Sequence, residues 1–127
     1  MKKLKHVKMD KVNIEEKLGQ IKEYWDPHIA GELNGQQIKL AKIKGSFVWH
    51  SHEQEDEMFI VLKGQMRMHL RDKTIVVNQN EFIIVPKGIE HMPEAEEEVH
   101  LMLFEPAGTI NTGEVVNDKT KKYLKRI

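Results

Sequence analysis

The amino-acid sequence predicts an all-β domain built as an antiparallel sandwich or barrel. Short apolar segments separated by turn residues run from about residue 28 to about residue 106, as in such folds. The 127 residues suit one domain, and no linker, repeat or low-complexity tract divides them. With 39% hydrophobic and 31% charged residues, the composition is that of an ordinary globular protein.

A short helix is expected within the N-terminal arm, residues 1–25. Asn13 can cap it, with Glu16 three residues later as its capping-box partner. Ile14, Leu18 and Ile21 follow at the spacing of one apolar helix face. We expect a docking helix without a chemical role.

The strands of the barrel are predicted from the turns that separate them. Asn34-Gly35 is a strong two-residue hairpin turn, and Lys63-Gly64 is a second short turn. The expected strands are residues 29–33, 36–43, 47–52, 57–62, 65–70, 74–77, 81–85 and 99–104. The polar residues 107–127 are expected to form a C-terminal tail, with a short helix near residues 119–125.

The charge and composition exclude several classes of protein. Lys plus Arg and Asp plus Glu both number 20, and a net charge of zero argues against a nucleic-acid partner. The absence of cysteine excludes disulfides, thiolate metal sites and cysteine nucleophiles. No apolar run reaches the roughly 18 residues of a membrane span, and no apolar segment follows the basic start. We therefore expect a cytoplasmic protein without a membrane partner.

Charged residues gather in three runs. Residues 119–127 carry basic side chains and no acidic one, whereas residues 53–57 and 94–98 are acidic. Such runs are usual in solvated loops. The alternative is a basic arm of one subunit that lies on the acidic rim of another.

The most informative segment contains His50 and His52, which point to the same side if the segment is a strand. Glu57 lies five residues after His52, at the start of the next strand, and His91 follows the end of another strand. Three neutral imidazoles and one carboxylate suit one divalent transition-metal ion and leave coordination positions open. The ion could be Zn, Fe, Mn, Ni, Co or Cu.

The spacing around these residues resembles two motifs of the cupin family. The first is His50-x-His52-x4-Glu57-x6-Gly64, and the second is Pro86-x-Gly88-x2-His91. The resemblance covers residues 28–106 and is nearest to small single-domain cupins labelled mannose-6-phosphate-isomerase-like, a subgroup of uncertain function. It implies that residues 1–127 form one cupin domain with a double-stranded β-helix (jelly-roll) barrel. It also implies a metal held by His50, His52, Glu57 and His91.

The walls of the pocket can be predicted from the turn at Lys63-Gly64. A two-residue turn pairs Val61 with Met66 and Phe59 with Met68, and cross-strand partners share a face. The predicted pocket lining is Val48, Phe59, Val61, Met66 and Met68. The opposite face carries Trp49, Met58, Ile60 and Leu62, which is too apolar for a solvent-facing sheet. We expect a homodimer across this face, or a cover formed by the chain's own N-terminal segment.

The remaining histidines are expected to lie outside the set of ligands. His6 falls in the basic start of the chain, and His69 points away from the metal in the predicted register. His28 and His100 are interpreted as surface or sheet residues, although His100 could support the ligands from a neighbouring strand.

These features favour a metal-dependent enzyme acting on a small molecule, with isomerase, dioxygenase, decarboxylase and lyase chemistry all open. Ser46 and Gln54 are the polar candidates near the pocket mouth, and no catalytic residue is identified beyond the ligands. A non-catalytic module that binds or senses a small molecule is the alternative, and a dimer stapled by a structural metal is a third. Because a phosphate group needs cations and Lys87 is the one candidate, a non-phosphorylated substrate is expected over a phosphosugar.

Overall fold

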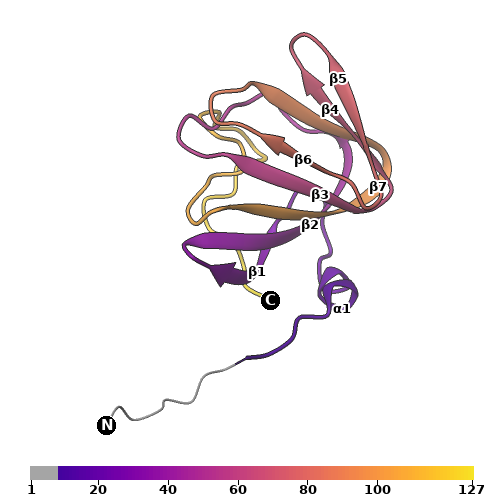
Figure 1. The fold of residues 1–127 in the computed structure, drawn as a ribbon, viewed down its shortest axis with the longest axis vertical. Helices are drawn as coiled ribbons and strands as arrows, with labels where there is room; N and C mark the ends of the chain where they lie inside the picture. The colour runs from indigo at the N-terminus through magenta and orange to yellow at the C-terminus, as the bar shows by residue number, and fades with distance from the viewer. Residues whose placement is uncertain (1–8) are drawn as a thin grey trace.

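The computed structural model describes residues 9–127, which form one short helix and seven strands (Figure 1). The helix α1 spans Ile14–Leu18. The strands are β1 (His28–Leu33), β2 (Gln36–Ser46), β3 (Glu57–Lys63), β4 (Gln65–Leu70), β5 (Thr74–Asn78), β6 (Phe82–Val85) and β7 (His91–Pro106). Within residues 9–127, no helix is long and apolar enough to cross a membrane.

The strands pair antiparallel in the order β1-β2-β7-β3-β6, and β4 pairs with both β5 and β7. The long strand β7 joins the two layers of the barrel, since its residues 91–94 pair with β4 and its residues 100–104 pair with β3. The strand β2 follows β7 along most of its length. This arrangement confirms the predicted all-β jelly roll.

The core of the barrel is formed by the inward side chains of alternate residues along each strand. Phe59 and Val61 of β3 and Met66 and Met68 of β4 are buried in it, as the alternation predicts. They pack with residues from β2, β5, β6 and β7, namely Ile43, Val77, Val85, Ala95, Val99, Leu101 and Leu103.

The predicted hairpin at Lys63-Gly64 is wrong, because β3 and β4 pair with different parts of β7 and not with each other. At Gly64 the chain crosses from one layer to the other with φ of 90°. A Cβ atom there would lie 3.0 Å from the Glu98 carbonyl oxygen and 3.0 Å from Val99 Cγ2. Only glycine allows this close passage over β7 with a positive φ.

The predicted strand over residues 47–52 is also wrong. Phe47 N donates to Pro93 O at 3.0 Å, and His50 forms an isolated bridge with His91. The segment therefore follows the start of β7 as an irregular loop. β7, in turn, begins eight residues earlier than the sequence predicts, at His91 instead of Val99.

Both ends of the described chain pack against the barrel. Asn13 Oδ1 accepts a hydrogen bond from Glu16 N at 3.0 Å, as the capping pattern predicts, and α1 buries Leu18 against Leu40 of β2. At the other end, Ile29 N of β1 donates to Lys125 O at 2.8 Å.

No helix forms over residues 119–125, so that prediction is wrong. Two basic side chains of the tail have acidic partners within the same chain: Arg126 pairs with Glu32, and Lys121 pairs with Asp26. The His6 prediction falls outside the described residues.

The outer face of β3 and β6, defined as Met58, Ile60, Phe82 and Ile84, is apolar. Strand pairing sets Met58 beside Ile84 and Ile60 beside Phe82. Phe82 is 62% exposed and Ile84 54% exposed. The N-terminal segment covers the neighbouring part of the sheet, where Leu62 and Met102 pack against the cluster that contains Leu18. The cover by the chain's own N-terminus is thus partial.

Candidate metal centre

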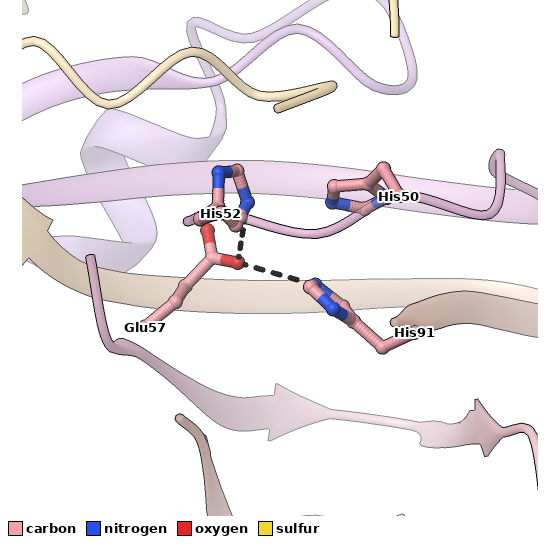
Figure 2. Close-up of side chains that lie close together, drawn as sticks. All are labelled: His50, His52, Glu57 and His91. Atoms are coloured by element: carbon pink, nitrogen blue, oxygen red, sulfur yellow. Dashed lines mark ion pairs between the residues drawn. The ribbon is translucent and has the colours of Figure 1, made fainter. Parts of the chain in front are cut away.

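The four side chains predicted as ligands converge on one point inside the barrel (Figure 2). His50 and His52 come from the loop between β2 and β3, Glu57 opens β3, and His91 opens β7. One ligand atom from each of the four lies within 4.8 Å of the others, and all four side chains are buried.

Backbone hydrogen bonds hold the two halves of the cluster together. His50 N donates to His91 O at 3.0 Å, and His91 N donates to His50 O at 2.9 Å. Gly88 N donates to His52 O at 2.8 Å, which ties the loop before β7 to the loop before β3. Two segments about 40 residues apart in sequence are therefore fixed side by side.

The orientation of two imidazoles is also fixed. Nδ1 of His50 lies 2.8 Å from Val48 O, and Nδ1 of His91 lies 2.9 Å from Ile89 O. A carbonyl oxygen can only accept, so Nδ1 carries the proton in each ring and Nε2 is left with a free lone pair. Both Nε2 atoms are thereby prepared to bind a cation.

The distances in the cluster suit a first-row divalent ion. Glu57 Oε1 lies 3.3 Å from His52 Nε2 and 3.6 Å from His91 Nε2. Two ligands about 2.1 Å from a shared ion at angles of about 90–120° are about 3.0–3.6 Å apart. These three atoms are buried and have no hydrogen-bond partner. A cation would satisfy all three, so the residues fit the ion that the motif implies.

The electrostatics of the cluster favour the ligand forms of its side chains. Burial, helped by the nearby imidazole of His91, lowers the pKa of His50 to about 4. Burial alone would raise the pKa of Glu57, but the close side chains of Glu105, His52 and His91 outweigh it and lower that pKa well below its usual range. The cluster therefore holds a neutral His50 and a carboxylate at Glu57 at neutral pH.

A cavity with largely apolar walls opens beside the cluster. His50 and Glu57 form part of its wall, together with Trp25, Pro27, Lys39, Ala41, Ile43, Phe47, Phe59, Pro93, Leu101, Leu103, Glu105, Asn111 and Leu124. Trp25 stacks on Phe47 with ring centres 4.7 Å apart, and Phe47 in turn meets the edge of His50 at 5.3 Å. Segments from both ends of the chain thus complete a cavity whose polar wall includes the metal cluster.

A buried ion pair lines the same cavity. Lys39 Nζ donates to Glu105 Oε1 at 2.6 Å, and the two residues are 1% and 2% exposed. Burial and the neighbouring charge of Glu57 raise the pKa of Glu105 well above its usual range, although Lys39 opposes this. A second carboxyl group, distinct from the ligand Glu57, therefore lies next to the cluster.

The sequence-based reasoning missed this pair, although one signal was available. Lys39 lies on the same face of β2 as Ala41 and Ile43, because residues two apart on a strand share a face. Glu105 likewise shares a face of β7 with Leu103. A charged side chain at an inward position of a strand needs a buried partner. The alternation indicates that each residue is buried, but not that the two meet.

The predicted pocket lining is only partly placed on this cavity. Phe59 lies in its wall. Val61, Met66 and Met68 are instead fully buried in the core cluster, which also holds Val77 of β5 and Leu101 of β7. Val48 is half-buried, and its backbone oxygen accepts the hydrogen bond from His50.

The other candidates from the sequence lie away from the cluster. His100 pairs across the sheet with Lys42 and Lys63, and its Nε2 contacts Glu98 at 2.7 Å, so it does not support the ligands. His69 contacts Thr74 and Glu94.

The two polar candidates for the pocket mouth do not line the cavity beside the metal cluster. Ser46 Oγ donates to Glu94. Gln54 lines a separate pocket with His52 and Glu114. The backbone N of Lys87 donates to Asp56, and its side chain is exposed. His28 is buried, with Nδ1 2.7 Å from Asp26 O.

Comparison with known proteins adds three findings. Residues 38–105, which include all four cluster residues, match the family described as Cupin domain. The uncharacterized protein YdbB of Bacillus subtilis (strain 168) is 36% identical over 73 residues, which are 57% of this chain and 65% of YdbB's own length.

Two solved structures are similar over most of the chain. A cupin-2 domain containing protein from Shewanella frigidimarina NCIMB 400 is 40% identical with a TM-score of 0.74, covering 75% of this chain and 93% of that one. Protein NMB1881 from Neisseria meningitidis is 31% identical with a TM-score of 0.71, covering 77% of this chain and 100% of that one.

Proposed function

The chain belongs to the cupin domain family, and from this premise we propose that it is a metal-dependent enzyme. Its substrate is a small, polar, non-phosphorylated molecule, and its centre is one divalent ion held by His50, His52, Glu57 and His91. The reaction is an isomerisation, a dioxygenation or a related conversion. The ion would act as a Lewis acid that polarises an oxygen of the substrate.

One observation carries the choice of an enzyme over a binding module: the cavity beside the cluster contains a second, buried carboxyl group. Glu105 and Glu57 line the same cavity. A carboxyl group within reach of the reacting atoms can hold or deliver a proton, which a cluster of metal ligands cannot do alone. Lys39 fixes the orientation of Glu105 through the 2.6 Å hydrogen bond.

The charges around the cavity support a non-phosphorylated substrate. Lys39 is the one Lys or Arg among the residues that line it, and it is already paired with Glu105. Arg67 and Arg71 pair with Glu96 and Glu90. A phosphate group in this cavity would lack free cationic partners and would face the carboxylate of Glu57.

The runner-up is a module that binds or senses a small molecule without converting it. The apolar walls, with Ile43, Leu101 and Leu103, favour this reading, because they suit binding and bring no proton-transfer group. A sugar-phosphate isomerase is a lower alternative.

The experiment uses protein purified without an affinity tag, so that no foreign histidine binds metal. Elemental analysis gives the bound ion, and the chelated protein is reloaded with each of the six candidate ions in turn. Each form is incubated with small alcohols, ketones and sugars and with mannose 6-phosphate, and products are followed by NMR and by oxygen uptake. His52→Ala is the matched control for metal-dependent turnover.

The outcomes separate the three readings. One ion per chain and turnover of a non-phosphorylated compound that His52→Ala lacks would support the proposal. Saturable binding without turnover would favour the binding module, and turnover of mannose 6-phosphate would favour the isomerase. Protein that takes up none of the six ions would contradict the metal centre itself.

A further inference from the structure

Among the described residues, four buried polar side-chain atoms have no hydrogen-bond partner: His52 Nε2, Glu57 Oε1, His91 Nε2 and Glu105 Oε2. The first three belong to the metal cluster, where a cation would satisfy them. The fourth belongs to a residue outside the ligand set. A buried carboxyl oxygen without a partner is costly, so its position calls for a group that binds there.

The position of this oxygen is fixed by its neighbours. Lys39 Nζ donates to the other oxygen of the same carboxyl group, Oε1, at 2.6 Å, and also lies 3.4 Å from Thr109 O. The register sets Gln37 of β2 opposite Glu105 of β7, so Lys39 is the diagonal neighbour on the same face. With Oε1 held by Lys39, Oε2 is left for the cavity that Glu105 lines together with Glu57.

The surroundings of Glu105 limit what can bind it. Leu101, Leu103 and Ala41 form apolar walls, and the stacked rings of Trp25 and Phe47 form a flat aromatic one. A molecule with a compact apolar body would fill such walls. A hydroxyl group is the match for Glu105, because it can donate to a carboxylate and accept from a carboxylic acid.

We propose that Glu105 is a substrate-binding residue, oriented by Lys39. The small polar substrate then has a compact, planar apolar part that fits the apolar walls, and a hydroxyl group that hydrogen-bonds to Glu105 Oε2. This rests on the proposed function only in taking the cavity beside the metal cluster as the substrate site. Lys39 acts as a positioning residue, since its Nζ is engaged by Glu105 and Thr109.

The test uses phenol and toluene, two probes of similar shape of which only phenol has a hydroxyl group. Binding is followed by NMR through the methyl groups of Ala41, Ile43 and Leu101, which face the cavity. Wild type is expected to bind phenol about tenfold more tightly than toluene, as one hydrogen bond to a buried charged or polar group provides.

Three variants separate a binding role from a structural one. In Glu105→Gln the single amide oxygen accepts from Lys39 and the NH2 group faces the cavity. Because the oxygen of phenol can accept from this NH2 group, the variant is expected to keep most of the preference for phenol. Glu105→Leu is expected to bind the two probes equally. That single variant leaves Lys39 buried without a partner and could unfold the protein. The double variant Lys39→Met with Glu105→Leu removes both charged groups, and its methyl spectrum checks that it is folded. It is expected to lose the preference for phenol as well.

The proposal is overturned if neither probe shifts these methyl groups, or if the preference for phenol survives in the double variant. Metal content is measured on every sample. A wild type that prefers phenol through Glu105 but takes up no ion supports the role of Glu105 and contradicts the metal centre. A double variant that holds one ion yet keeps the preference contradicts only the role of Glu105.

Discussion

His50 and His91 exchange two backbone hydrogen bonds, of 3.0 Å and 2.9 Å, and thereby bring the two cupin motifs into contact. The loop that carries His50 and His52 lies outside the strands, at residues 47–56, and this bridge ties it to β7 together with the hydrogen bond from Phe47 N to Pro93 O. The metal cluster thus depends on an irregular loop that is pinned to the first residue of β7.

Replacing one ligand should remove metal binding. His52→Ala is expected to lower the affinity for the divalent ion by at least about 100-fold, because loss of a ligand exceeds the effect of losing a supporting hydrogen bond. His69→Ala is the matched control, since His69 contacts Thr74 and Glu94 away from the cluster. Metal content after dialysis checks this. A His52→Ala protein with a full complement of metal would show that the ion binds elsewhere.

Acid should destabilise the metal-free protein. The pKa of His50 falls from 6.5 to about 4 on folding, so between those two pH values the unfolded chain takes up a proton that the folded chain does not. The contribution of His50 to the free energy of unfolding is therefore fully present above pH 6.5. It falls by about 3 kcal/mol as the pH drops to 4. Urea unfolding in the presence of a chelator measures it. His50→Gln should show a shallower pH dependence, and an unchanged slope would be the contrary result.

Removing one partner of the buried ion pair should lower the free energy of unfolding more than replacing both partners with apolar residues. Lys39→Met or Glu105→Leu alone leaves one buried charge without its partner, and each is expected to lower the free energy of unfolding by about 3–5 kcal/mol. The double variant removes both charges and should be more stable than either single variant. Denaturant unfolding of the four proteins forms a double-mutant cycle. Simple additivity of the two losses would mean that the residues do not interact in solution.

The packing of the C-terminal tail, residues 107–127, should depend on the absence of a side chain at Gly113. A Cβ atom at this position would lie 2.0 Å from the carbonyl oxygen of Ser51, next to His52. Gly108 also has a positive φ, of 86°, but a Cβ atom there meets nothing within 4 Å. Gly113→Ala is therefore expected to cost about 1–3 kcal/mol more than Gly108→Ala, through overpacking. Thermal unfolding of both variants, with hydrogen exchange over residues 107–127, provides the measurement. Equal losses would mean that only the backbone conformation matters.

For the outer face of β3 and β6 we propose that a second copy of this chain covers it. Phe82 and Ile84 are each more than half exposed, and pairing places them beside Ile60 and Met58 in one apolar surface. Phe82→Glu with Ile84→Lys should convert a dimer into a monomer in light scattering coupled to size exclusion. Leu33→Glu, at an apolar side chain of β1 that is 46% exposed, is the control, because β1 lies at the opposite end of the strand order from β6. A wild-type protein that stays monomeric even at the highest protein concentration measured would contradict the dimer.

Much of the barrel could be predicted because local patterns report local structure. The turn at Asn34-Gly35 does join two paired strands, and Leu33 faces Gln36 across it. The cap at Asn13 is formed as its spacing predicts. The cluster residues were identified from residue types and spacing alone, and the structure brings all four together. In each case, the information lies within a few residues or within two recognisable motifs.

Other features depended on contacts between distant parts of the chain. Lys63-Gly64 looks like the turn of a hairpin, yet Gly64 passes over Val99, and β3 and β4 each pair with a different part of β7. Residues 47–52 alternate as a strand does, but only His50 finds a bridging partner. A pattern with period two indicates which side chains are buried without stating which strand lies alongside.

The sequence by itself determined the alternation of buried and exposed residues, the short capped helix and the residue types that can hold a divalent ion. The tertiary structure decided that Lys39 meets Glu105, 66 residues away, beside that cluster. It also decided that the tail packs on β1, where Ile29 bonds to Lys125. The physical reason is that backbone geometry imposes a side-chain period locally, whereas the pairing of distant segments depends on the packing of the whole barrel.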